Sequence, residues 1–375
     1  MKRRQLGEEK ETKVQDWKTW RAEREAQRKK WKEEKLLKKL EKEEKKEKEE
    51  VQHEEDGEGK RCGRPYTISI AVPGSIMDNA QNAELRTYLA GQVARAAAVF
   101  CVDEVVIYDD TGAAKKDISA DSVLTSTTAG RGTVQMARIL QYLECPQYLR
   151  KQLFPIHRDL QFAGLLNPLD CSHHLRATED APYREGIVTN LPVKEGKGSL
   201  VNCGLKKEVR IDRHLQPGIR VTVKLNPKSL EDSTRKLSGV AVAPSTPREE
   251  HGIYWGYEVR VAHSLSTVLT ECPFPKGYDL TLGTSDKGDS VDDLELPRGF
   301  KHAIVVFGGL QGLEAALEAD EDLNIDDPSF LFSHYINTCP GQGSRTIRTE
   351  EAILITLAAL RPKVAMAQNL SSEGP

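Results

Sequence analysis

The pattern of apolar and polar positions changes near Arg64, where a run of charged residues ends and structured elements begin. The sequence YTISIAV, residues 66–72, is a short apolar run typical of a buried strand, and residues 83–100 carry apolar side chains at helical spacing. VDEVVIYDD, residues 102–110, predicts a second strand, and residues 134–153 predict a second helix. This alternation of strands and helices is typical of an α/β fold with a parallel sheet covered on its faces.

A different pattern follows Pro155, with short alternating runs separated by Gly, Pro and Asn. These runs are YREGIVTNLPV, GSLVNCGL, KEVRIDRHL, GIRVTVKLN and YWGYEVRVAHSL. Their regular spacing is typical of a small antiparallel β-barrel. We therefore predict a barrel at residues 169–272, inserted between two halves of one α/β domain, residues 63–168 and 273–375.

The α/β pattern resumes at Tyr278, and three of its loops are rich in small residues. They are LGTSDKG (282–288), VFGGLQG (306–312) and NTCPGQGSRT (337–346). Because the carboxyl ends of parallel strands meet at one edge of a sheet, the three loops can line one crevice. None of them fits GxxxxGK[ST] or GxGxxG, so main-chain contacts to an adenine and ribose are favoured over a phosphate cradle. The alternative is that the glycines only make turns.

The last loop leads into a helix that is apolar almost all round from Ala352 to Leu360. Such a helix is expected to be buried, either in the core of its own domain or also against a second subunit.

Charge is concentrated in a tail, residues 1–62, which we predict to be helical or disordered. The first 60 residues hold 20 basic and 18 acidic side chains, so the remainder, with 34 basic and 39 acidic, has no general excess of positive charge. Any nucleic-acid surface on the folded part must therefore be local. Trp17, Trp20 and Trp31 lie in the tail, which is either a solvated helix or an arm for RNA, nuclear import or a cytoskeletal partner.

Cysteine and histidine spacing predicts no metal site. The seven cysteines form no CxxC pair, which favours reduced thiols in the cytosol or nucleus. His173 and His174 lie in a polar segment and are expected to be exposed to solvent rather than to bind a metal. No apolar run is long enough to span a membrane, so no membrane partner is expected.

The segment PGQGSRTIRTEEAILITLAAL, residues 340–360, resembles the terminal knot segment of the SPOUT methyltransferases. With GRPYTISIAVPGS, LRTYLAGQVARAAAVFCVDEVV and VNCGLKKEV, residues 63–361 resemble the members of that class that methylate N3 of uridine in ribosomal RNA. The resemblance implies a Rossmann-like sheet with a C-terminal trefoil knot, an OB-like inserted barrel, a homodimer and S-adenosyl-L-methionine as cofactor.

The resemblance also implies roles for individual residues. Arg95, in GQVARAA, matches the position of a catalytic arginine in many SPOUT enzymes, and Arg86 and Arg348 are further catalytic candidates. Arg86 and Arg95 are equally explained as residues at the edge of a helix, with their aliphatic stems along the apolar surface and their charged ends in water. The implied cofactor-binding residues are Gly283, Thr284, Ser285, Lys287, Phe307, Gly308, Gly309, Gly312, Asn337, Thr338, Pro340, Gly341, Gly343, Ser344 and Thr346.

The inserted barrel is the expected RNA-binding module, because OB-like folds present a strand face to single-stranded nucleic acid. The RNA-binding candidates are Lys206, Lys207 and Arg210 in the barrel and Arg345 in the last loop, with Arg213, Arg220 and Lys224 adding to the local charge. Tyr254, Trp255 and Tyr257 can stack on bases, although aromatic residues in a small barrel more often fill its core.

We therefore predict an RNA methyltransferase that modifies N3 of a uridine in large ribosomal RNA. A second hypothesis is an RNA-binding interaction protein of the spindle or centromere that retains the cofactor site, with spindle, microtubule or kinetochore partners bound through the tail. A nucleotide-dependent dehydrogenase is disfavoured by the missing GxGxxG motif. The expected locations are the nucleus or nucleolus, the cytoplasm and, in dividing cells, the mitotic spindle and centromere.

Overall fold

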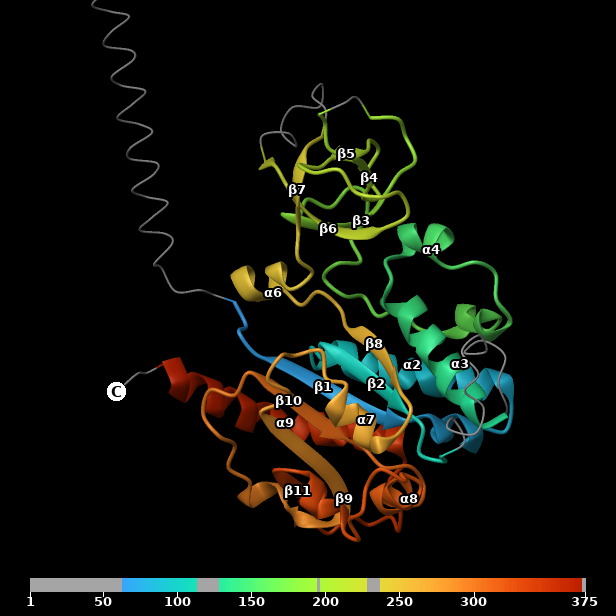
Figure 1. The fold of residues 1–375 in the computed structure, drawn as a ribbon, viewed down its shortest axis with the longest axis vertical. Helices are drawn as coiled ribbons and strands as arrows, with labels where there is room; N and C mark the ends of the chain where they lie inside the picture. Colours follow the sequence, from blue (N-terminus) through green and yellow to red (C-terminus); the bar gives the residue numbers. More distant parts are fainter. Residues whose placement is uncertain (1–62, 113–127, 194–195, 228–236, 373–375) are drawn as a thin grey trace, which may run out of the picture. The chain divides into compact units, whose positions relative to one another are not determined.

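A computed structural model describes residues 63–112, 128–193, 196–227 and 237–372, so the predictions for the tail lie outside the described residues. Its main sheet has six parallel strands in the order β11-β9-β10-β1-β2-β8 (Figure 1). The strands are β1 (Thr67–Pro73), β2 (Glu104–Tyr108), β8 (Glu258–Ala262), β9 (Leu280–Ser290), β10 (His302–Val306) and β11 (His334–Asn337). The predicted parallel sheet is confirmed.

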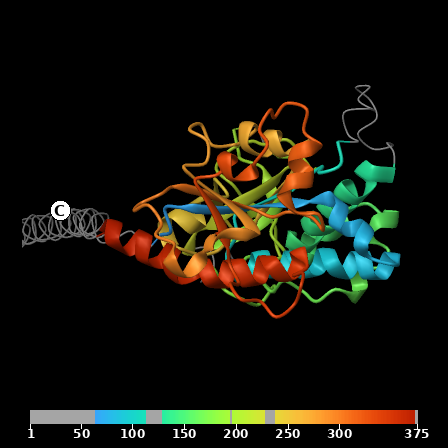
Figure 2. The same cartoon turned by 90° about the horizontal axis from the view of Figure 1, so that it is seen from below.

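Helices cover both faces of this sheet. One core contains Ile70 and Val72 of β1 together with side chains of α2, α3 and α9, and a second core contains Ala71 together with side chains of α7 and α8. Neighbouring residues of β1 therefore serve opposite cores, which explains its continuous apolar run. In Figure 2, α9 (red) and α2 (cyan) lie together along one side of the sheet. The helices are α2 (Ala83–Val99), α3 (Thr128–Glu144), α4 (Gln147–Leu153), α6 (Thr246–His251), α7 (Leu265–Thr270), α8 (Gly312–Glu318) and α9 (Thr349–Ser372).

Short 3-10 helices fill several connections: η1 (Gly74–Asn79), η3 (Arg158–Leu160), η4 (Ala163–Leu165), η5 (Val291–Asp293) and η6 (Pro328–Leu331). Among the described residues, no helix combines the length and apolar character needed to cross a membrane.

A second sheet of five antiparallel strands has the order β5-β4-β3-β6-β7. A bridge between Arg210 and Ser238 brings its two edges together, so the sheet curls around a core of its own that includes Val201 and Val223. This confirms an additional antiparallel module, whereas the domain boundaries stay predictions. The strands are β3 (Tyr183–Val188), β4 (Leu200–Asn202), β5 (Val209–Arg210), β6 (Arg220–Leu225) and β7 (Gly239–Val242), of which β7 was not predicted.

Two assignments made from the pattern were wrong. The run YWGYEVRVAHSL was placed in the barrel, but its strand β8 pairs in parallel with β2 at the edge of the main sheet. An edge strand exposes polar positions, so its alternation resembles that of an antiparallel strand; Arg260 of β8 donates to Glu104 of β2 at 2.9 Å. The single helix predicted for residues 134–153 is also two helices, α3 and α4, which are separated at Pro146 because proline cannot continue the backbone hydrogen bonds.

A buried charged junction connects the end of α3 to the antiparallel sheet. Arg220 donates from Nη1 and Nη2 to the carboxylate of Glu144 at 2.7 and 2.9 Å, and from Nε to Glu185 at 2.7 Å. The other Glu185 oxygen accepts hydrogen bonds from Thr222 and Trp255. Burial alone would raise the pKa of Glu144, but hydrogen bonds from His173 and Arg220 outweigh it and lower the pKa to about 2. Arg220, expected on an RNA surface, is thus used inside the protein.

Candidate functional site

All three predicted loops line one cleft of about 1010 Å³ at the carboxyl ends of β9, β10 and β11. The opposite wall is made by residues of η1 and α2 and by the first turns of α9. This volume suits a ligand of nucleoside size or larger. The predicted common crevice is therefore present, at the position where ligands bind in parallel α/β sheets.

The first loop is a bulge within β9 rather than a loop after a strand, which corrects the expectation for residues 282–288. Gly283 pairs with Tyr335, and the next pairing joins Asp289 to Ile336, so residues 284–288 stand out from the ladder into the cleft. Asn337 holds the bulge by donating from Nδ2 to the carbonyl oxygen of Asp286 at 2.9 Å. Of the predicted residues here, Thr284, Ser285 and Lys287 line the cleft, whereas Gly283 does not.

The second loop needs its glycines because backbone segments meet closely in it. A Cβ built on Gly308 would lie 2.6 Å from the carbonyl carbon of Gly312, and one on Gly309 would lie 3.0 Å from the Asp110 carboxylate. Gly312 itself has φ +80°, which favours glycine. Thr349, the first residue of α9, donates to the carbonyl oxygen of Gly308 at 2.9 Å. All the predicted residues of this loop, Phe307, Gly308, Gly309 and Gly312, line the cleft.

The third loop is divided between the cleft wall and a turn beside it. Asn337, Thr338 and Thr346 line the cleft, and Thr338 shares a hydrogen bond of 2.9 Å with Thr356 of α9. The predicted residues outside the lining are Pro340, Gly341, Gly343 and Ser344.

Sequence reasoning missed the wall formed by η1 and α2. Asn79, Gln81, Tyr88 and Gln92 line the cleft there and offer amide groups and an aromatic ring. The signal that could have revealed this wall is in PGSIMDN, residues 73–79, whose polar residues follow β1 directly, as those of the second and third loops follow β10 and β11.

The four candidate arginines separate into two groups. Arg345 and Arg348 line the cleft, and their side chains are exposed. Arg95 and Arg86 do not line it: Arg95 donates from Nη1 to the carbonyl oxygen of Leu169 at 2.6 Å, and Arg86 lies 3.8 Å from Asp78. The catalytic roles of Arg86, Arg95 and Arg348 stay predictions, and Arg348 has the most suitable position.

Acidic groups also surround the cleft. Glu314 forms an ion pair of 2.7 Å with Lys287 across it, and Glu350 and Glu351 line it at the start of α9. Behind Gly309, burial raises the pKa of Asp110, although hydrogen bonds from Ser75 oppose this shift. The site thus combines exposed cationic side chains with neighbouring carboxylates.

Three of the four RNA-binding candidates lie on the antiparallel module, and the fourth, Arg345, lines the cleft. Lys206 and Lys207 are exposed between β4 and β5, and Arg210 is half-buried in β5; their role stays a prediction. The aromatic residues are used differently: Trp255 and Tyr257 are buried, and the Tyr257 hydroxyl donates to the carbonyl oxygen of Leu140 at 3.0 Å. These two rings pack inside the protein and cannot stack on bases.

The two histidines expected in solvent are not exposed. His173 is completely buried and His174 is partly buried, because their segment folds against the end of α3, where both rings contact the carbonyl oxygen of Glu144. A polar sequence context did not reveal this, since the contact is made by a residue that is distant in the sequence.

Comparison with known proteins supplies the family. Residues 67–360 match the family described as "Putative RNA methyltransferase". The human 28S rRNA (uridine-N(3))-methyltransferase is 58% identical over 316 residues, which cover 84% of this chain and 83% of that protein. The mouse protein of the same name is 59% identical over 300 residues, covering 80% and 77%.

A more distant relative and a solved structure extend the comparison. The Caenorhabditis elegans protein spot-1 is 41% identical over 312 residues, covering 79% of this chain and 81% of that protein. The SpoU methyltransferase AviRb from Streptomyces viridochromogenes, solved with AdoMet, is 9% identical and covers 80% of this chain and 59% of that chain with a TM-score of 0.31. A likeness at this score supports no conclusion, so the sequence matches decide: the chain belongs to this family of RNA methyltransferases.

Proposed function

We propose that this protein transfers a methyl group from S-adenosyl-L-methionine to N3 of a uridine in large-subunit ribosomal RNA. The observation that carries the proposal is the 58% identity, over 84% of the chain, to the human protein named 28S rRNA (uridine-N(3))-methyltransferase. The family match, residues 67–360, contains every residue that lines the cleft, so the proposal concerns this same site.

The cleft suits a nucleoside cofactor held by main-chain groups. Gly308 and Gly309 bring the backbone close to the space between the loops; a side chain on Gly308 would collide with the Gly312 backbone, and one on Gly309 would press against the Asp110 carboxylate. The bulge of β9 adds Thr284 and Ser285, and the third loop adds Asn337 and Thr338. Uncharged donors and acceptors of this kind fit an adenine and a ribose.

The cationic side chains fit the acceptor. The cofactor supplies a methyl group on a sulfonium, which is reactive toward a nucleophilic nitrogen when the two are in line. Loss of the N3 proton places negative charge on the uracil ring and its O2 and O4 atoms. Arg345 and Arg348 are the cleft arginines that can stabilise this charge, and Glu350 or Glu351 can accept the proton.

A trefoil knot and a homodimer are part of this proposal. For the knot, α9 is joined to the earlier loops by the hydrogen bonds from Thr349 to Gly308 and between Thr356 and Thr338. For the dimer, α9 is not buried all round, since Leu354 is 43% exposed, and Leu85 and Tyr88 of α2 are also exposed. A second subunit seated on α2 and α9 would cover these side chains.

The test is methyl transfer from labelled S-adenosyl-L-methionine to purified ribosomal RNA that lacks the modification, followed by digestion to nucleosides. We expect the label in 3-methyluridine from the large-subunit RNA alone. Label in another nucleoside would refute the target atom, and no label with the RNA supplied as assembled pre-ribosomal particles would refute the activity.

The RNA-binding role of Lys206, Lys207, Arg210 and Arg345 is part of the same proposal. The proposed nuclear, nucleolar and cytoplasmic locations rest on the cysteine pattern and the charged tail, and spindle or centromere association through residues 1–62 rests on the resemblance and the tail. A tagged chain beginning at Cys62 distinguishes the enzymatic role from the role of the tail. It should keep methyl transfer and lose any spindle localisation.

A further inference from the structure

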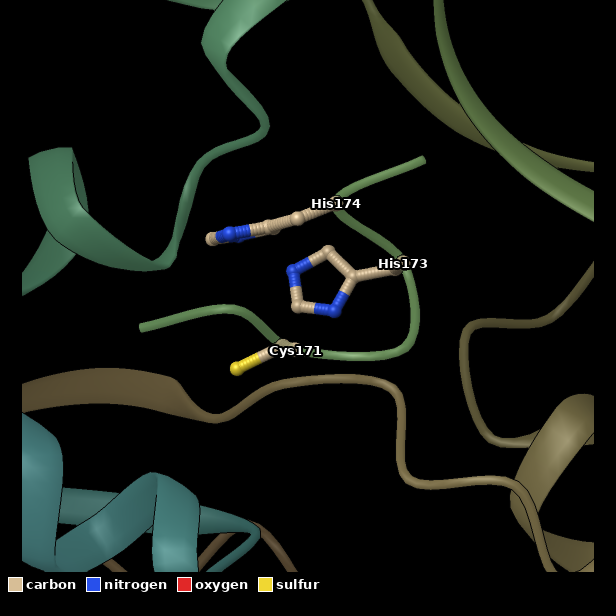
Figure 3. A group of neighbouring side chains, drawn as sticks. All are labelled: Cys171, His173 and His174. Atoms are coloured by element: carbon tan, nitrogen blue, oxygen red, sulfur yellow. The ribbon is translucent and has the colours of Figure 1, made fainter. Parts of the chain in front are cut away.

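A four-residue turn at the entrance to the antiparallel module carries three metal-ligating residue types. Cys171, His173 and His174 each place one possible ligand atom within 4.8 Å of those of the other two. The turn is closed by a hydrogen bond of 2.9 Å from the His174 N–H to the Cys171 carbonyl oxygen, after Asp170 at φ 54°. Figure 3 shows the three side chains projecting into the same space inside this turn.

The two imidazoles are held in a defined state by one residue, Glu144, whose carboxylate also lies 3.0 Å from Nε2 of His173. Nε2 of His173 lies 2.8 Å and Nε2 of His174 lies 2.7 Å from the carbonyl oxygen of Glu144. Because a carbonyl oxygen only accepts hydrogen bonds, both Nε2 atoms donate. In each neutral ring Nδ1 then carries a lone pair, which is the form that binds a metal.

The Nδ1 lone pair of His173 accepts no hydrogen bond from the residues that the structure describes. The residue is also completely buried. The ring also packs directly on backbone, since a Cβ on Gly256 would lie 2.8 Å from its Cε1. A buried acceptor left without a partner is costly, and a bound ion is one of the few explanations for it.

We propose that Cys171, His173 and His174 bind one zinc ion, with Nδ1 of His173 as one of the ligands. One thiolate and two imidazoles are the donor types that Zn²⁺ prefers, whereas Mg²⁺ and Ca²⁺ require oxygen. Zinc bonds of about 2.0–2.3 Å keep donor atoms about 3.4–3.8 Å apart, so the three side chains move closer together when the ion binds. Water fills the fourth position.

The ion would act as a structural clamp. Histidine ligands of zinc commonly donate their second ring nitrogen to a carbonyl or carboxylate, and here both donate to Glu144. The Glu144 side chain binds Arg220 of β6, so the same residue meets the proposed zinc turn and the antiparallel sheet. This proposal is independent of the methyltransferase activity, because none of the three ligands lines the cleft.

The test uses the full chain purified without a polyhistidine tag, incubated with zinc sulfate, freed from unbound metal and analysed by mass spectrometry for zinc. We expect about one zinc per chain in the natural protein and in the control Cys272→Ser, which removes another partly buried thiol. Cys171→Ser should lose most of the bound zinc.

A second measurement needs no variant, which matters if Cys171→Ser does not fold. Cobalt(II) added to the folded natural protein should give the absorption band of a thiolate–cobalt bond, and zinc should abolish it. Less than about one tenth of a zinc per chain together with no such band would overturn the proposal. Equal zinc in the natural protein and a folded Cys171→Ser variant would also overturn it.

Discussion

The cleft and the charged junction satisfy their polar groups in opposite ways. In the cleft, glycines and small residues bring the backbone to the wall, and charged side chains such as Arg345 and Arg348 remain exposed. In the junction, Arg220, Glu144 and Glu185 satisfy one another with hydrogen bonds of 2.7–2.9 Å. The polar groups of the cleft are therefore available to bind a ligand, whereas those of the junction bind one another and stabilise the fold. Substitutions should therefore affect binding and catalysis in one region and stability in the other.

The largest effect is expected from Arg220→Ala. It leaves the carboxylates of Glu144 and Glu185, which are 8% and 4% exposed, without their cation. Removing one partner of a buried ion pair costs about 3–5 kcal/mol in the free energy of unfolding. Denaturant titration of the folded chain measures it. Lys224→Ala on the same strand is the control, since its pair with Glu250 is half-exposed and should contribute about 0–1 kcal/mol. Equal losses for the two variants would contradict the contrast.

Arg348→Ala should reduce methyl transfer by about 10²–10³-fold if its guanidinium stabilises the charge on the uracil. Its side chain is 76% exposed, so the free energy of unfolding should hardly change. Single-turnover kinetics at saturating cofactor measure the rate. Arg361→Ala, on the same helix but outside the cleft, is the matched control. A decrease in stability without a decrease in rate would place Arg348 with the junction residues instead.

Gly308→Ala should weaken binding of S-adenosylhomocysteine by about 10–100-fold, equivalent to about 1.4–2.7 kcal/mol. The added Cβ would meet the Gly312 backbone at 2.6 Å and displace the loop. Calorimetric titration measures the affinity. In Gly164→Ala the new methyl group has nothing within 4 Å, so that variant should bind as the natural protein does. Unchanged affinity in Gly308→Ala would show that this loop does not contact the cofactor.

The smallest effect is expected from Thr349→Val, which removes one hydrogen bond to the carbonyl oxygen of Gly308 while keeping the shape of the side chain. The free energy of unfolding should fall by about 0.5–1.5 kcal/mol, with a similar loss in cofactor affinity. Thermal unfolding with and without S-adenosylhomocysteine distinguishes the loss of stability from the loss of cofactor affinity. A loss confined to stability would mean that the helix start supports the fold but does not position the loop.

The same contrast explains what the sequence could predict. The three loops were recognisable because each has small residues and glycines next to a strand or, for the first, within β9, and local composition reports local backbone requirements. The junction was not recognisable, because Arg220 and Glu144 are 76 residues apart and each resembles an ordinary surface charge in its own segment. The burial of His173 was not predicted for the same reason, because its partner Glu144 is distant in the sequence. The strand β8 was wrongly assigned to the barrel because an alternating pattern does not distinguish the edge strand of a parallel sheet from an antiparallel strand.

The strand order has a consequence for the folding of the chain. β1 lies between β2 and β10, and the contact between Thr67 and His302 joins residues 235 positions apart. During synthesis, one edge of this apolar strand therefore stays unpaired until residues 302–306 of β10 have left the ribosome. Contacts over such separations close slowly, whereas the antiparallel sheet pairs neighbouring segments and can form early. The nascent chain is thus most prone to aggregation along β1, and it depends on β10 for protection of that edge.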